Sequence, residues 1–127
     1  MRLEYLPAGP PDCPLVRLFD FEADEVIRLR GLVTELADGS RNHLAVHELS
    51  GIEAVRECRL VFEVGPQRVG LVEEQPPNSL RCILAPEDWR EVAELMEPFC
   101  RPGGARGFQW LHSAGPISLL LSHDGRW

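Results

Sequence analysis

The stretch from residue 79 to residue 100 constrains the fold of this chain most, because it predicts a strand that runs directly into a helix. Apolar residues alternate with others over Ser79–Leu84, which is the length and pattern of a strand. Pro86 suits the first position of a helix, where no backbone donor is needed. The carboxylates of Glu87 and Asp88 then meet the positive end of the helix dipole. This unit therefore predicts a helix that begins near residue 86.

The predicted helix carries a single apolar stripe. Its large apolar side chains follow one another at spacings of three and four residues: Trp89, Val92, Met96 and Phe99. Residues with this spacing share one face of an α-helix, so the stripe should pack against a sheet. Pro98 lacks a backbone N–H group and should help to end the helix.

Strand and turn signals alternate over most of the remaining chain. Short apolar or alternating runs predict strands at Arg2–Leu6, Leu15–Phe19, His43–Leu49, Arg59–Val64, Arg68–Glu73, Phe108–Leu111 and Ile117–Leu121. The link Gly65–Gln67 is tight enough to predict a hairpin, and Ser113–Pro116 predicts a turn between the last two strands. A first helix is predicted from about residue 22 to residue 37, with Asp20 as its N-cap and Gly39 after its end.

The predicted order is two strands, a helix, four strands, a helix and two strands. Helices that come singly between runs of antiparallel strands indicate an α+β fold. A chain of 127 residues is long enough to bury a core without metal ions or disulfides. We therefore expect a single α+β domain over residues 1–127, with a mostly antiparallel curved sheet of about six to eight strands and two helices on one face.

Charge and composition exclude several classes of function. The net charge of −7 argues against nucleic acids and anionic membranes as partners, because both are bound by a clustered basic face. All 13 basic residues are arginines. Without lysine there is no Schiff-base residue and no Walker-A lysine, so pyridoxal-phosphate enzymes and P-loop NTPases are excluded.

The cysteines give no sign of a disulfide framework or a paired metal site. They stand far apart, at Cys13, Cys58, Cys82 and Cys100, and no two form a CxxC motif. Residues 1–5 have neither the basic region nor the long apolar run of a signal peptide. No stretch approaches the roughly 18 apolar residues of a membrane span. We therefore expect a cytoplasmic, soluble, acidic protein with reduced thiols.

Two histidines form an H-x-x-x-H pattern, which invites a metal assignment. A zinc-protease motif needs glutamate directly after the first histidine, but Leu44 follows His43. On a strand, His43 and His47 would share one face about 13 Å apart, which is too far for one ion. We therefore expect two solvent-facing histidines on a half-exposed strand.

A second potential ligand set is scattered along the chain: Cys13, Cys100, His112 and His123. Structural zinc sites take ligands in closely spaced pairs, and none occurs here. Cys100 with His112 could form a nucleophilic pair, but Cys100 falls at the C-terminal end of the predicted helix. The pair is disfavoured, because the negative end of the helix dipole raises the pKa of a thiol there. No G-x-S-x-G motif is present. We expect no metal, no cofactor and no catalytic residue.

Two further features remain as candidates for binding. The glycine-rich segment 103–107 could cradle an anion, but it follows a helix and leads into a strand, which is the reverse of the phosphate-binding order. The residues that we assign to a pocket or an interaction surface are Cys100, Trp110, His112 and Trp127.

Two functions remain open on this sequence. The first is a small non-enzymatic accessory or protein-interaction domain, which would bind a protein partner or itself through an exposed sheet face or strand edge. The alternative is a small-molecule-binding or catalytic domain, with a pocket between the sheet and the two helices.

Overall fold

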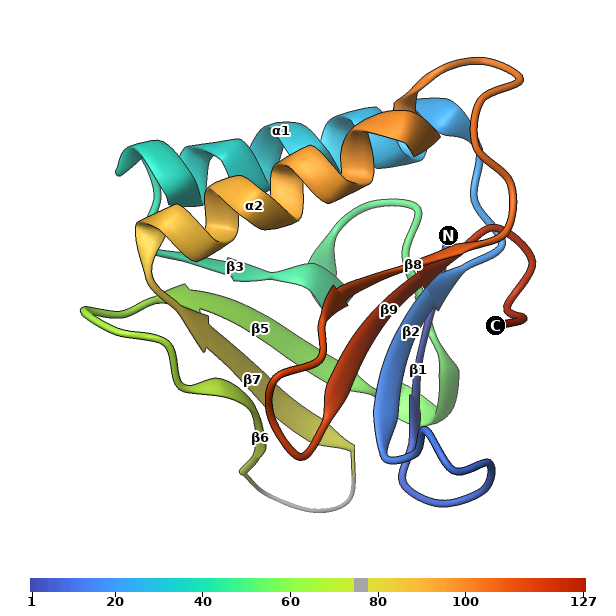
Figure 1. Ribbon diagram of the computed structural model, residues 1–127, viewed down its shortest axis with the longest axis horizontal. Coiled ribbons are helices and arrows are strands. Elements are labelled where there is room, and N and C mark those ends of the chain that lie inside the picture. Colours follow the sequence, from blue (N-terminus) through green and yellow to red (C-terminus); the bar gives the residue numbers. More distant parts are fainter. Residues whose placement is uncertain (75–77) are drawn as a thin grey trace.

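The computed structural model describes residues 1–74 and 78–127, which form two helices and nine strands (Figure 1). The helices are Ala23–Asp38 (α1) and Pro86–Met96 (α2). The strands are Arg2–Leu6 (β1), Leu15–Phe19 (β2), His43–Ala45 (β3), Glu53–Ala54 (β4), Arg59–Val64 (β5), Gly70–Glu73 (β6), Ser79–Leu84 (β7), Phe108–His112 (β8) and Ser118–Ser122 (β9). Three short 3-10 helices are Val46–Glu48 (η1), Val55–Glu57 (η2) and Glu97–Cys100 (η3).

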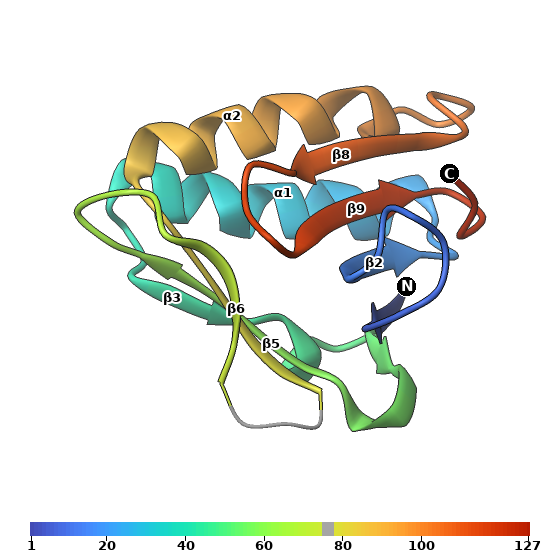
Figure 2. The ribbon, with the colours of Figure 1, turned by 60° about the horizontal axis from the view of Figure 1, so that its bottom comes forward.

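The strands are arranged in two mixed sheets. Sheet A has the order β4-β1-β2-β9-β8, and sheet B has the order β3-β5-β7-β6. Three of the pairings are parallel, namely β1 with β4, β2 with β9 and β5 with β7. Helices α1 and α2 lie side by side over the sheets (Figures 1 and 2). The predicted α+β class, with two helices on one face, is confirmed. The strands number nine and form two sheets, where the sequence predicted about six to eight in one mostly antiparallel sheet.

The core lies between the helices and the inner faces of the two sheets. Trp89 of α2 is completely buried, and its ring lies 4.8 Å from that of Phe62 on β5. The indole N–H of Trp89 donates a hydrogen bond of 3.1 Å to the carbonyl oxygen of Glu63. Three residues of the predicted apolar stripe, Trp89, Val92 and Met96, are buried on α2 as expected. The fourth, Phe99, is also buried but lies beyond the α-helix, in η3. The α-helix ends at Met96, before Pro98, and the chain continues as η3.

The hairpin predicted at Gly65–Gln67 is wrong. Strand β7 lies between β5 and β6, parallel to β5 and antiparallel to β6. The Gly65 N–H donates to the carbonyl of Leu84, and the Val69 N–H to that of Ile83. The link therefore passes over the end of β7 instead of turning back beside β5. The spacing of turn residues along the chain does not reveal that a later strand takes the neighbouring place.

Two other sequence predictions need correction. Strand β3 ends at Ala45 instead of Leu49, and His47 lies in η1, where its Nδ1 accepts a 3.0 Å hydrogen bond from the Leu60 N–H. Of these two histidines, His43 is therefore exposed on a strand and His47 is not on a strand. The N-cap of α1 is Glu22 instead of Asp20, because the buried Phe21 separates Asp20 from the helix.

Neither helix within the described parts of the chain has the length and apolar character that crossing a membrane requires.

We predict that Trp89→Ala lowers the free energy of unfolding by about 3–5 kcal/mol, because it empties a large buried site. The total stability of a domain is about 5–15 kcal/mol, so this variant should be severely destabilised. Denaturant unfolding followed by circular dichroism would measure the change. Ile27→Ala is the control, since that side chain on α1 is 52% exposed. An equal effect of both substitutions would contradict the packing described here.

Gly31 offers a test in which the free energy of unfolding should rise. It lies exposed in the middle of α1, and a β-carbon built there meets no atom within 4 Å. We predict that Gly31→Ala raises the free energy of unfolding by roughly 0.5–1 kcal/mol, because alanine loses less backbone entropy in a helix. Gly39→Ala should be destabilising, since Gly39 ends α1 with a φ of 88°. Thermal unfolding should therefore order the melting temperatures as Gly31→Ala, wild type and Gly39→Ala, from highest to lowest.

Candidate functional site

A cleft of about 210 Å³ lies between α2 and the C-terminal end of β8. We call it the α2–β8 cleft. Its apolar lining residues are Leu84, Val92, Leu95, Trp110, Leu111 and Ala114, and its polar ones are Arg68, Asp88, Glu91, His112 and Ser113. Most of these residues belong to α2 and β8. The two elements lie next to each other, with β8 directly beneath α2 in Figure 2.

A β-bulge in β8 sets the direction of its last side chains. Trp110 pairs with Leu120 of β9, but His112 pairs with the next residue, Leu119, so Leu111 is an extra residue in the strand. Leu120 faces away from the main core, whereas Leu119 belongs to it. The bulge therefore turns His112 to the inner side of sheet A, while Trp110 stays on the outer side.

His112 points across the gap between the two sheets toward Gly70 of β6. A β-carbon at Gly70 would lie 3.0 Å from His112 Nε2, and Gly70 has a φ of 95°. The Nε2 atom is buried without a hydrogen-bond partner among the described residues. Burial lowers the pKa of this imidazole, the nearby Arg68 lowers it further, and Asp88 acts in the opposite direction. At neutral pH the ring is therefore uncharged.

An ion pair closes one side of the cleft. The Nε and Nη2 atoms of Arg68 donate to Oδ1 of Asp88, at 3.2 and 2.6 Å. Asp88 Oδ2 accepts a 3.2 Å bond from the backbone N–H of Ala85, at the start of α2. The side chain of Asp88 is only 12% exposed. The hydrogen bonds from Arg68 hold the pKa of this carboxyl below its usual value, and the bond from Ala85 adds to the effect.

The polar side chains that line the cleft include the ion pair of Arg68 with Asp88. Among the described residues, no hydrogen bond joins His112 to Asp88 or to Ser113, so no base is aligned with a nucleophile. The described parts of the chain also contain no group of three or more potential metal ligands. The cleft instead presents an aromatic wall, an ion pair and a neutral imidazole.

The structure brings together two of the four residues that the sequence assigned to a pocket or surface. Trp110 and His112 line the same cleft. Cys100 lies at the end of η3, where its Sγ is 3.6 Å from the carbonyl of Met96. Trp127 lies elsewhere, and its indole donates a 3.0 Å hydrogen bond to Asp12. Arg68 and Asp88 were not predicted as site residues, since no local motif joins positions 20 residues apart in the chain.

The scattered cysteines and histidines do not form one site. His123 packs its ring 5.7 Å from that of Phe21, and Cys13 lies beside Gly9. All four cysteines are free thiols. Burial raises the pKa of Cys58 to about 11 and that of Cys82 to about 12, so neither acts as a thiolate at neutral pH.

The glycine-rich segment 103–107 borders a second hollow, of about 370 Å³, beside the first turn of α1. A helix N-terminus there would attract an anion. The chain supplies a carboxylate of its own instead, because Glu25 Oε1 accepts a 2.9 Å hydrogen bond from the backbone N–H of Glu22 at this helix end. This hollow is therefore a poorer site for an anion than its glycines indicated.

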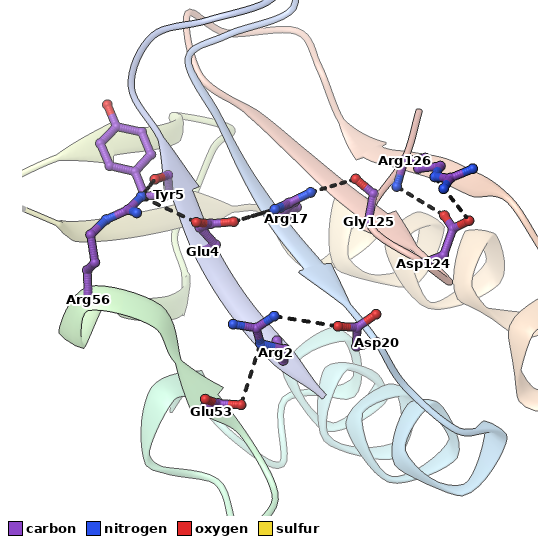
Figure 3. Close-up of polar contacts among 10 residues, drawn as sticks. All are labelled: Arg2, Glu4, Tyr5, Arg17, Asp20, Glu53, Arg56, Asp124, Gly125 and Arg126. Atoms are coloured by element: carbon purple, nitrogen blue, oxygen red, sulfur yellow. Dashed lines mark hydrogen bonds and ion pairs between the residues drawn. The ribbon is translucent and has the colours of Figure 1, made fainter.

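A network of ion pairs covers the outer face of sheet A (Figure 3). Glu4 of β1 is only 8% exposed and lies between two guanidinium groups, those of Arg17 at 2.5 Å and Arg56 at 3.3 Å. Arg17 also donates to the carbonyl of Gly125 and lies over the ring of Phe19. Through Arg17, residues near position 125 are therefore held on this face. The network lies on the same sheet as β8, which carries Trp110.

No family model, curated protein or solved structure matches this chain, so its function has to be inferred from its own geometry.

We predict that Asp88→Asn lowers the free energy of unfolding by about 1 kcal/mol at pH 7, because it removes a partly exposed ion pair. The folded-state pKa of Asp88 is depressed below the unfolded value of about 3.9. The stabilisation is therefore complete above the unfolded pKa and is lost as the pH falls through the folded pKa. Unfolding curves between pH 7 and pH 2 should show the difference from wild type shrinking below about pH 4.

Glu94→Gln is the matched control, since Glu94 lies exposed on the same helix outside the α2–β8 cleft. It should change stability little at any of these pH values. A constant difference between Asp88→Asn and wild type across the range would show that the ion pair does not contribute.

Proposed function

We propose that this protein is a small non-enzymatic protein-interaction domain, whose partner binds at the outer side of β8 and the neighbouring α2–β8 cleft. The observation that carries the proposal is the distribution of aromatic side chains. Six of them are buried: Tyr5, Phe19, Phe21, Phe62, Trp89 and Phe99. The other three are Phe108, Trp110 and Trp127, all in the last 20 residues of the chain.

Phe108 and Trp110 lie together on the outer side of an edge strand. Phe108 is 47% exposed, and its ring stands edge-on to that of Trp110 at 6.3 Å. Strand β8 pairs only with β9 among the described strands. Exposed aromatic residues cost free energy in water, and they are enriched in the binding hot spots of protein interfaces.

The surroundings of these rings also suit an interface. Trp110 forms part of the wall of the α2–β8 cleft, which has apolar residues at its base and charged residues at its rim. Interfaces commonly have this arrangement, with a pocket that receives an anchor side chain and a polar border. The four free thiols are consistent with action in the reducing cytoplasm.

We favour this function over the alternative, a small-molecule-binding or catalytic domain with a pocket between the sheet and the helices. Buried side chains of α1, α2 and both sheets occupy that space. The α2–β8 cleft is also smaller than the roughly 300–1,000 Å³ that is typical of small-molecule sites. Its histidine has no hydrogen-bonded nucleophile among the described residues.

Photo-crosslinking in cells that express the protein would test this proposal. We predict that Phe108→p-benzoylphenylalanine yields a discrete crosslinked species, identified by mass spectrometry as another protein or a second copy of this chain. Ile27→p-benzoylphenylalanine is the matched control, because Ile27 is similarly exposed, at 52%, but lies on α1. The crosslink at position 108 should weaken at least several-fold when Trp110→Ala is added.

Equal, diffuse crosslinking from positions 27 and 108 would contradict an interface at β8. Circular dichroism of the Trp110→Ala variant would establish that its fold is retained.

A further inference from the structure

The size of the α2–β8 cleft suits one side chain. Its volume of about 210 Å³ is too small for a large cofactor. Three of its apolar lining residues are buried, namely Leu84, Val92 and Leu111. Its rim is charged. A long side chain with an aliphatic stem and a polar head matches this combination, because the stem can lie on apolar surface while the head meets the charges.

The charges around the cleft favour a cationic head. Three carboxylates act on the guanidinium of Arg68: those of Asp88, Glu91 and Glu87, in decreasing order. Only Asp88 is bonded to it, and Glu91 has no ion pair among the described residues. Among the charged side chains that line the cleft there are thus two carboxylates, those of Asp88 and Glu91, and one guanidinium, that of Arg68. The excess matches the net charge of −7 of the whole chain, which attracts basic partners.

The other polar and aromatic groups of the cleft also favour a cation. His112 is uncharged at neutral pH, so it adds no positive charge. Trp110 is one of the residues that line the cleft, and a guanidinium stacks well on an aromatic face. Arg68 already shows how a guanidinium is held by a carboxylate in this place, with two N–H groups on one oxygen. Arginine is better suited than lysine to both contacts.

We propose that the partner of this protein anchors itself by an arginine side chain, which enters the α2–β8 cleft between Trp110 and Glu91. This inference rests on the proposed function and adds the chemistry of the partner. The guanidinium pairs with the Glu91 carboxylate and lies against the indole, and the aliphatic stem covers the leucines and Val92 below. The partner segment around this arginine then contacts Phe108.

Short peptides can test this proposal with the whole protein. The probe is the pentapeptide acetyl-Gly-Gly-Arg-Gly-Gly-amide, followed by ¹H–¹⁵N NMR of the tryptophan indole N–H signals. The peptide should shift the signal of Trp110 with saturable, salt-sensitive binding, and should leave that of Trp89 unchanged, because the Trp89 indole is buried and bonded to Glu63. The same peptide with citrulline, a neutral isostere of arginine, should bind at least tenfold more weakly.

Two matched variants locate the binding charge. Glu91→Gln removes a carboxylate at the rim of the cleft, and Glu94→Gln removes an exposed one on the same helix outside it. We expect Glu91→Gln to weaken binding of the arginine peptide at least threefold and Glu94→Gln to change it by less than twofold. Equal binding of the citrulline and arginine peptides would overturn the inference, as would equal effects of the two variants or tighter binding of a glutamate peptide.

The outcome is separable from that of the proposed function. If the crosslink at position 108 forms and the arginine peptide does not bind, the interaction surface stands and the arginine anchor is wrong. If the arginine peptide binds at Trp110 and no crosslink forms, the cleft recognises a guanidinium but β8 is not the partner's surface.

Discussion

The burial of Trp89 determines where α2 lies. Its ring fills the space beside Phe62, and its N–H bonds to the carbonyl of Glu63, so the one polar atom of the indole is not left without a partner. Asp88 is the preceding residue of the same helix. The contact that holds the helix on the core therefore also sets the place where Asp88 meets Arg68. The stability of the core and the shape of the α2–β8 cleft depend on the same turn of helix.

The second determinant of the cleft is the bulge in β8. In a regular strand Trp110 and His112, which are two residues apart, would lie on the same face of sheet A. With the bulge, Trp110 stays at the outer wall and His112 turns toward Gly70. The cost is a buried Nε2 atom without a partner among the described residues. The bulge thereby separates an aromatic side chain on the outer face of sheet A from a neutral polar one on the inner face.

The outer face of sheet A combines apolar and charged side chains in an unusual way. Glu4 is buried between Arg17 and Arg56, and Arg17 also lies over Phe19 (Figure 3). Removing both arginines would leave the carboxylate of Glu4 without an ion pair in a poorly solvated place, which is strongly destabilising. This network holds β1 and β2 in place beside β9, and β9 in turn carries β8. The proposed interaction surface therefore stands on a rigid support instead of a loop.

Local signals in the sequence were sufficient for most of the elements. The apolar stripe of α2, the early Pro86 and the stop before Pro98 act within one or two turns of helix, so they could be recognised from spacing alone. Strands β1, β2, β5 and β7 have the predicted bounds for the same reason. The sequence also singled out Trp110 and His112, but it grouped them with Cys100 and Trp127, which lie elsewhere. The order of strands in the sheets, the bulge at Leu111 and the pairing of Arg68 with Asp88 depend on contacts between distant parts of the chain. No residue pattern records which strand will lie beside which, because that choice is made by the packing of the whole core.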